Sequence, residues 1–189
     1  MAKIDASGSD DIISLLQGLG EETQNVCAMA LYKGMQVTAD ALREAIEDLP
    51  TEPFHPLPGA VNGADPLNVL TEDDKEDMLN GITIARFEHT GFGVNSAASI
   101  EGYSRHKTKR FPSGIPLPMI ARSIESGSSA RRKHPFIRPM MRSREEQIVE
   151  AMEDAVHTAV DVYAATGSLP AIDSAGGDST GRGIRKVKG

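Results

Sequence analysis

Apolar side chains recur at helical spacing over residues 21–49, so this segment is the strongest helix prediction in the chain. Six residues form the stripe: Cys27, Leu31, Met35, Leu42, Ile46 and Leu49. Residues spaced three to four apart share one face of a helix. Glu21 and Glu22 favour the start through the helix dipole, and Pro50 favours the end because the residue before a proline avoids the α region. The pattern predicts a long amphipathic helix whose apolar face lies in the core.

A second amphipathic helix is predicted near the other end of the chain. Ser143 and Glu146 have the spacing of a capping box, which predicts that the helix begins there. Its apolar face follows the same helical period and consists of Ile148, Val149, Met152, Ala155, Val156, Ala159 and Tyr163. We expect this helix to end near residue 166, where glycine and serine become frequent.

The patterns between these helices are shorter. Thr71 and Asp74 predict a capped acidic helix that ends near Asn80. Residues 82–90 and 93–104 are predicted as two strands, and residues 118–126 as a short helix or strand. The fold class expected is therefore α+β: a long N-terminal helix and a C-terminal amphipathic helix packed on a small, mostly antiparallel sheet, with extended loops.

Proline and glycine define the expected domain organisation. We expect one domain over residues 1–166, with a proline-rich arm at 50–70 and a basic loop at 104–117. Residues 167–189 are rich in glycine and serine with a basic end, a composition typical of a flexible tail.

Composition narrows the classes of protein. The 189 residues include no Trp, three Tyr and five Phe, so the core must be mostly aliphatic. The net charge of -7 gives no global field that attracts nucleic acid. The single cysteine, Cys27, excludes an internal disulfide and a zinc site built from several cysteines. Its place on the apolar stripe predicts a small core residue and not a nucleophile.

Neither end of the chain suggests a membrane segment. The first residues lack the apolar region of a signal peptide, and no apolar run approaches the ~20 residues that a membrane span needs. We expect no membrane association.

The candidate catalytic groups are sparse. The five histidines show no metal-binding spacing such as HExxH. Glu153, His157 and Asp161 lie four residues apart on one helix face, which is more typical of a solvated, mixed-charge face than of a catalytic ladder. We therefore expect no metal, no cofactor and no enzymatic activity.

A serine triad could also be assembled on paper from Ser128, His134 and Glu125. Ser128 is not surrounded by the sequence of a nucleophile elbow, so chance composition is the better explanation. A hydrolase stays as a third hypothesis, which a pocket joining His157 to a second histidine would support.

Two cationic clusters give the alternative function. They are His106-Lys107-Lys109-Arg110 and Arg131-Arg132-Lys133. Nucleic-acid surfaces use such clusters, usually with stacking aromatics or a reading helix, and only Tyr103, Phe111 and Phe136 lie nearby. The alternative function is therefore a nucleic-acid-binding accessory protein that acts through its basic loops. The competing interpretation of the clusters is that they are solvated loops or that they contact acidic neighbours.

The segment Pro135-Phe136-Ile137-Arg138-Pro139 has an unusual design. Two prolines stiffen an apolar pair in an extended conformation, so the segment loses little entropy when it docks. Two interpretations remain open. Phe136 closes one end of the chain's own core, or it inserts into a neighbouring subunit while the basic loop contacts an acidic surface there.

Two motifs in this region resemble those of a known family. Glu125-Ser126-Gly127-Ser128 and Pro135-Phe136-Ile137-Arg138-Pro139-Met140 are similar to the Glu-x-Gly-Ser/Thr and Pro-Phe-Leu-Arg-Pro-Ala motifs of long-tailed-phage neck and tail-completion proteins. These form the tail-component family of lambda-like siphophages. Ala30-Leu31 and Gly34 in the long helix are similar too, and the resemblance covers residues 12–50 and 77–165.

The resemblance implies a structural virion protein, made in the host cytoplasm and located at the head–tail junction. Such proteins form rings, often six-fold, between head-closure and tail-terminator or tail-tube proteins, around DNA that passes without sequence-specific binding. On this basis we expect one segment to contact other subunits or partners. It comprises Glu125, Gly127, Arg131, Arg132, Lys133, Pro135, Phe136, Ile137, Arg138 and Pro139.

Overall fold

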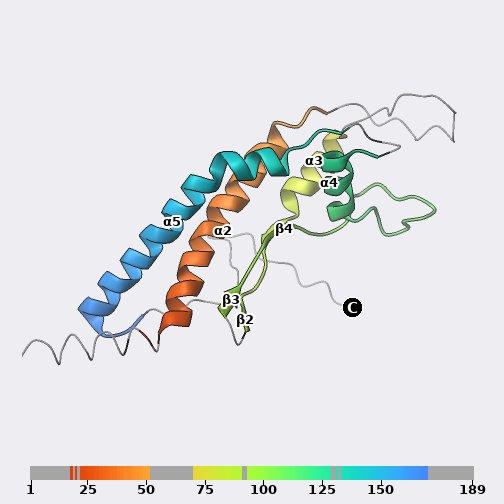
Figure 1. The fold of residues 1–189 in the computed structure, drawn as a ribbon. Helices are drawn as coiled ribbons and strands as arrows, with labels where there is room; N and C mark the ends of the chain where they lie inside the picture. Colours follow the sequence, from red (N-terminus) through yellow and green to blue (C-terminus); the bar gives the residue numbers. More distant parts are fainter. Residues whose placement is uncertain are drawn as a thin grey trace, which may run out of the picture. The chain divides into compact units, whose positions relative to one another are not determined.

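The structure is a computed structural model and confirms the α+β class. It describes residues 18, 20, 22–51, 70–90, 93–128, 131 and 133–169. Its elements (Figure 1) are α2 (Thr23–Glu47), α3 (Glu72–Asn80), β1 (Ile82–Ile84), β2 (Glu88–Thr90), β3 (Gly93–Asn95), β4 (Ala98–Ile100), α4 (Leu117–Ser126) and α5 (Ile137–Thr166). Most of the proline-rich arm and of the C-terminal tail lies outside the described residues.

The chain divides into two compact units. Unit 1 comprises residues 1–34, 85–97 and 150–189, and unit 2 comprises residues 35–84 and 98–149. Both long helices contribute one segment to each unit, so each unit is described by itself below.

Unit 2 holds the main hydrophobic core. Its largest fully buried side chains are Ile46, Leu70, Met78, Ile120 and Ile124. They come from α2, α3, α4 and the segment that precedes α3, and all are aliphatic or methionine. The core therefore has the composition that the scarcity of aromatic residues predicts.

Within unit 2, β1 and β4 form an antiparallel pair that faces α3 and α4. The register pairs Ile82 with Ile100 and Ile84 with Ala98. The backbone N–H of Glu101 donates to the carbonyl of Gly81 at 2.8 Å, which extends the pairing to the end of α3.

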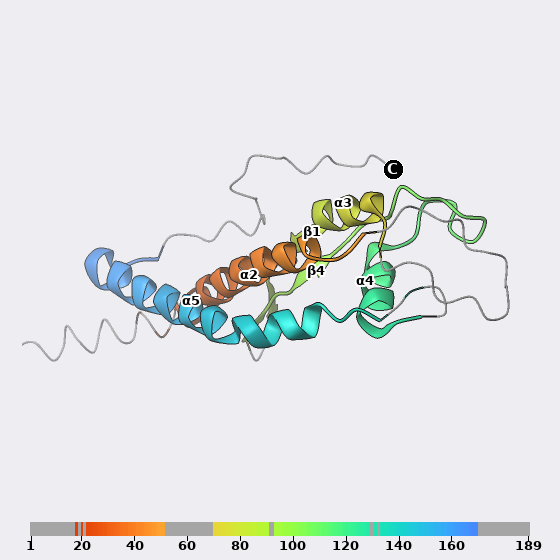
Figure 2. The ribbon, with the colours of Figure 1, turned by 90° about the horizontal axis from the view of Figure 1, so that it is seen from above.

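Within unit 1, the first part of α2 runs antiparallel to the last part of α5 (Figures 1 and 2). Tyr163 of α5 lies against Gly18, before α2, where any side chain larger than hydrogen would collide with its hydroxyl. On α2, the ring of Tyr32 meets that of Phe87 edge to face, with centroids 6.1 Å apart. The antiparallel pair β2–β3 completes the described part of this unit.

The two predicted strands are each broken. Residues 82–90 form β1 and β2 separated by residues 85–87, and the return segment forms β3 and β4 separated by residues 96–97. At the interruption, the hydroxyl of Ser96 donates to the carbonyl of Ala85 at 2.8 Å. The backbone N–H of Ala85 also donates to the carbonyl of Ala97 at 2.8 Å, so the two segments stay joined where the strands are interrupted.

The predicted start of the last helix is wrong. The helix α5 begins at Ile137, not at Ser143, and Ser143 lies in its second turn, where its hydroxyl donates to the carbonyl of Met140 at 2.9 Å. By contrast, Thr71 does cap α3, since its hydroxyl oxygen accepts the N–H of Asp74 at 3.1 Å. The segment predicted as either helix or strand is the helix α4.

The position of Cys27 also differs from the prediction. The helix α2 covers the predicted segment to within two residues at each end, and Leu42, Ile46 and Leu49 are buried as expected. Cys27, however, is exposed. The neighbouring Ala28 is buried in its place, because the small side chain lets α2 pack closely on that face.

Among the described residues, no helix is both long and apolar enough to span a membrane.

Candidate functional site

The two motifs that carry the family resemblance meet in space through Glu125. This residue lies in the last turn of α4, and its carboxylate accepts hydrogen bonds from the first backbone N–H groups of α5. Oε2 accepts from Phe136 at 2.8 Å and from Ile137 at 2.9 Å, and Oε1 accepts from Arg138 at 3.3 Å. We call this arrangement, formed by Glu125 and residues 136–138, the clamp.

The clamp satisfies the start of α5 without a local capping residue. The first N–H groups of a helix have no partner within the helix. Pro139, which follows the clamp residues, has no N–H. The N–H of Met140 donates to the carbonyl of Phe136 at 3.1 Å. Together, one carboxylate and one proline therefore account for every donor of the first turn. The negative charge also lies at the positive end of the helix dipole.

The electrostatics of Glu125 follow from these contacts. Its side chain is 11% exposed, and this burial alone raises the pKa of the carboxyl group. The hydrogen bonds from Phe136, Ile137 and Arg138, with the charge of the Arg138 guanidinium 3.7 Å away, outweigh the burial and lower the pKa below its ordinary value. The carboxylate is therefore charged at neutral pH.

Gly127 allows the chain to turn from α4 into the following loop. Its φ of 77° and ψ of 160° lie in a region that is essentially restricted to glycine. A Cβ at this position would also lie 3.0 Å from the Cβ of Lys133. The loop is then closed by backbone hydrogen bonds: Ser128 and Arg131 exchange two, at 2.9 and 3.4 Å, and the N–H of His134 donates to the carbonyl of Ile124 at 2.8 Å.

Arg131 ties this loop to α3. Its guanidinium lies 3.0 Å from the carboxylate of Asp74, and the two side chains are only 17% and 5% exposed. The other oxygen of Asp74 has no hydrogen-bond partner within the described part of the chain. A buried carboxylate in this position depends on its cation. Arg131 therefore belongs to the interior of unit 2 and not to an exposed basic loop.

A second basic segment folds as a hairpin over residues 103–116, which we call the basic hairpin. Tyr103 and Pro116 form an antiparallel bridge, and the N–H of Ser104 donates to the carbonyl of Ile115 at 2.9 Å. Thr108 and Phe111 exchange backbone hydrogen bonds at the tip, at 3.0 and 3.1 Å. The hairpin is thus a defined structure, cross-linked at its base and at its tip.

Arg105 anchors the basic hairpin on the acidic face of α3. Its guanidinium lies 2.9 Å from Asp77, 2.8 Å from Glu76 and 3.3 Å from Asp73, and its backbone N–H donates to Asp77 at 2.7 Å. The hydrogen bonds with Asp77 and Glu76 raise the pKa of the Arg105 guanidinium further above its usual range. His106 adds a contact of 3.4 Å with Asp73.

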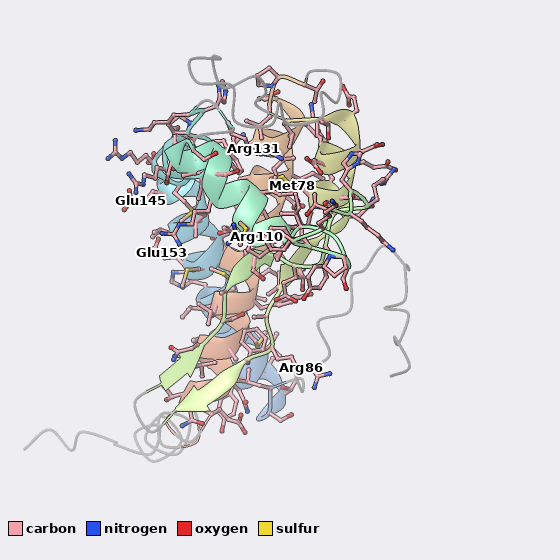
Figure 3. All side chains as sticks on the ribbon, turned by 90° about the vertical axis from the view of Figure 1, so that its right-hand side faces the viewer. Met78, Arg86, Arg110, Arg131, Glu145 and Glu153 are labelled. Atoms are coloured by element: carbon pink, nitrogen blue, oxygen red, sulfur yellow. The ribbon has the colours of Figure 1, made fainter. Side chains whose placement is uncertain are left out.

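The remaining cations of the basic hairpin are exposed. Lys107, Lys109 and Arg110 form no ion pair within the described residues. Arg110 lies over the ring of Phe111, 5.5 Å from its centroid, and at the base Tyr103 is 62% exposed. The labelled Arg110 and Arg131 in Figure 3 belong to the two basic segments. Within the basic hairpin, the tip is the part that is available to a partner.

The predicted contact segment divides into buried and exposed residues. The ring of Phe136 is 5% exposed and packs in the core of its own unit, so it is not available for insertion into a neighbouring subunit. Ile137 packs against the same core. Lys133, Pro135, Arg138 and Pro139 are exposed, and Arg132 lies outside the described residues.

The two arrangements considered for catalysis are not assembled. Both oxygens of Glu125 bind the backbone of α5, so this carboxylate does not orient His134. Glu153, His157 and Asp161 are exposed along α5, as the prediction of a solvated face expects. Within the described residues, no three His, Cys, Asp or Glu side chains are grouped as metal ligands.

Unit 1 contains a shallow groove between α2 and α5, with a volume of about 420 Å³. Its lining is mostly apolar and comprises Met29, Tyr32, Lys33, Ala151, Asp154, Ala155 and Thr158. None of the candidate residues named from the sequence lines it.

The sequence did not reveal the roles of Arg105 and Asp74. Each pairs with a residue far along the chain: Arg105 with α3 at separations of 28 to 32 residues, and Asp74 with Arg131 at 57 residues. The only local signal was the strong negative charge of α3 in a chain that also contains compact basic segments. That charge balance predicts mutual contact but not the pairs.

Comparison with protein-family models, with curated proteins and with solved structures yields no match for this chain.

Proposed function

We propose that the chain is a structural virion protein of the neck of a long-tailed phage. It forms a ring of identical subunits, six-fold in the simplest case, at the head–tail junction. The ring helps to complete the tail and joins it to the head through head-closure and tail-terminator or tail-tube proteins. DNA passes through the ring without sequence-specific binding, and the protein performs no reaction.

The observation that carries this proposal is the clamp. The most specific residues of the family resemblance, Glu125, Gly127 and Phe136, all have architectural roles: the first caps α5, the second permits the turn and the third fills the core. A motif that fixes two helices to each other is expected of a building block, whose task is to present surfaces at defined positions. The exposed residues in and beside the clamp, Lys133, Pro135 and Arg138, are the surface offered to neighbours.

An experiment on virions tests the proposal. Antibodies raised against the purified chain should label the head–tail junction of particles from a lysate of the producing host. Deletion of its gene should leave filled heads and tails that do not join. Unlabelled particles, or a deletion that yields normal infectious particles, would refute the proposal.

A second candidate function is nucleic-acid binding through the basic segments, and the exposed Lys107, Lys109 and Arg110 favour it. Phosphate contacts make the affinity fall with salt, by a slope of about -0.9 per contact in a double-logarithmic plot. Three contacts predict a slope near -3 for duplex DNA. No retention on DNA at low salt would exclude this function.

A further inference from the structure

The tip of the basic hairpin is an unneutralised cationic surface held in a fixed shape. Arg105 at the base has three carboxylate partners, whereas Lys107, Lys109 and Arg110 have none within the described residues. The tip is closed by the reciprocal bonds of Thr108 and Phe111, and the base by the pairing of residues 103–104 with 115–116. Three cations on a preformed turn lose little conformational entropy when they meet an anionic partner.

The base of the hairpin limits which anion can be the partner. The carboxylates of Asp73, Glu76 and Asp77 surround Arg105, and the whole chain carries a net charge of -7. A long polyanion such as DNA would extend beyond the tip and meet this repulsion. A short, discrete row of carboxylates on a protein surface can meet the tip alone, so the charge distribution favours an acidic protein surface.

Such a row is present on α5 within unit 1. Its members, which we call the acidic row, are exposed and recur at helical spacing: Glu150, Glu153, Asp154 and Asp161. No lysine or arginine occurs between Glu145 and Thr166, and the four carboxylates form no ion pair within the described residues. From residue 150 to residue 161 the row extends for about 16 Å at 1.5 Å per residue.

We propose that the basic hairpin of one copy docks on the acidic row of a second copy of this chain. Two different surfaces meet in this contact, so each copy can bind one neighbour on either side. Repetition of such a contact generates a ring when the rotation closes and a filament when it does not. The inference rests on the self-assembly in the proposed function and names the surfaces that carry it.

Charge reversal tests the contact in the purified full-length chain. Variant H carries Lys107→Glu, Lys109→Glu and Arg110→Glu; variant R carries Glu150→Lys, Glu153→Lys and Asp161→Lys. A control with Arg86→Glu, Arg122→Glu and Arg142→Glu matches the charge change of variant H at three other exposed sites. Sedimentation velocity at low and high salt measures association, and circular dichroism verifies the fold of each variant.

The wild type and the control should associate, more weakly at high salt. Variants H and R should each lose association by at least about tenfold, because several pairs turn from attractive to repulsive. An equimolar mixture of H and R should associate beyond a pair, since the native hairpin of R attracts the native row of H and the reversed hairpin of H attracts the reversed row of R. A chain that carries both sets of changes should associate again.

Other outcomes overturn the inference. Undiminished association of variant H, or equal loss in the control, removes the hairpin from the interface. Rescue in the double-set chain without pairing in the mixture indicates a contact within one copy. Duplex DNA binding that variant H alone loses, with no self-association of the wild type, assigns the tip to nucleic acid. In each case, labelling of the virion neck still tests the proposed function separately.

Discussion

At the scale of single residues, the carboxylate of Glu125 joins the end of α4 to the start of α5. Glu125 accepts three backbone N–H groups that no residue near the start of α5 could satisfy. Buried donors left without an acceptor cost free energy, so the side chain is a structural requirement. The loss of stability when Glu125 is replaced should therefore depend on how many hydrogen-bond acceptors the new side chain keeps.

Two replacements of Glu125 should separate the contribution of its charge to stability from that of its hydrogen bonds. We expect Glu125→Gln to lower the free energy of unfolding by about 1 kcal/mol, because the amide keeps one oxygen acceptor and loses the charge. Glu125→Ala should cost about 2–4 kcal/mol, since all three donors lose their partner. Urea unfolding measures both.

Glu146→Ala is the matched control, because Glu146 is an exposed glutamate of the same unit. This substitution should change the free energy of unfolding by less than about 0.5 kcal/mol. Equal effects of Glu125→Ala and Glu146→Ala would mean that the clamp contributes nothing to stability.

The buried pair of Arg131 and Asp74 gives a second prediction at this scale. Arg131→Ala should lower the free energy of unfolding by about 3–5 kcal/mol, because it leaves a carboxylate buried without its cation. The further change Asp74→Asn should recover part of that loss, since it removes the stranded charge. A double-mutant cycle measures the coupling.

In that cycle, Lys133→Ala provides the comparison, as an exposed cation of the same loop. If the two single variants and the double variant are simply additive, Arg131 acts as a solvated loop residue and the structural assignment fails.

At the scale of elements, the sequence predicted those helix positions and caps that depend on residues close together in the chain. The helix α2 and the Thr71 cap of α3 follow from residues close together in sequence, and both were predicted. The start of α5 was placed too late because its cap comes from Glu125, 11 to 13 residues earlier, across a turn and a loop. The Ser143–Glu146 spacing offered a local alternative that the tertiary contact overrides.

The broken strands and the basic segments show the same limit. The apolar pattern located the strands but not the interruption, where Ala85 bonds with Ser96 and Ala97 across the two segments. The two cationic clusters were recognised, yet which cations are neutralised was not visible. Arg131 is mostly buried in its pair with Asp74 of α3, whereas Lys107, in the hairpin that Arg105 anchors on the same helix, is exposed.

At the scale of the whole molecule, the charges are separated. In the sequence, cations gather on the basic hairpin and at residues 131–133, and carboxylates on α3 and on the second half of α5. A protein with a net charge of -7 can thereby present a positive surface to a negative one on another copy.

Stability should depend on pH through Glu125. Its pKa is lower in the folded chain than its ordinary value of 4.5. The stabilisation is therefore fully present above about pH 4.5 and is lost as the pH falls through the folded pKa. The difference in unfolding free energy between the wild type and Glu125→Gln should shrink over that acidic range and stay constant from pH 6 to 8.

The difference between the two proteins is the informative quantity, because it cancels the titration of carboxylates that they share. A difference that is constant down to pH 3, or one that grows as the pH falls, would contradict the role assigned to the charged carboxylate.

The clamp joins the two ends of the loop between α4 and α5, because the carboxylate of Glu125 accepts the N–H of Phe136. Insertions or deletions between these two points can alter the loop without shifting where α5 starts. Sequence changes in this loop therefore alter the surface between α4 and α5 while both helices keep their positions in unit 2.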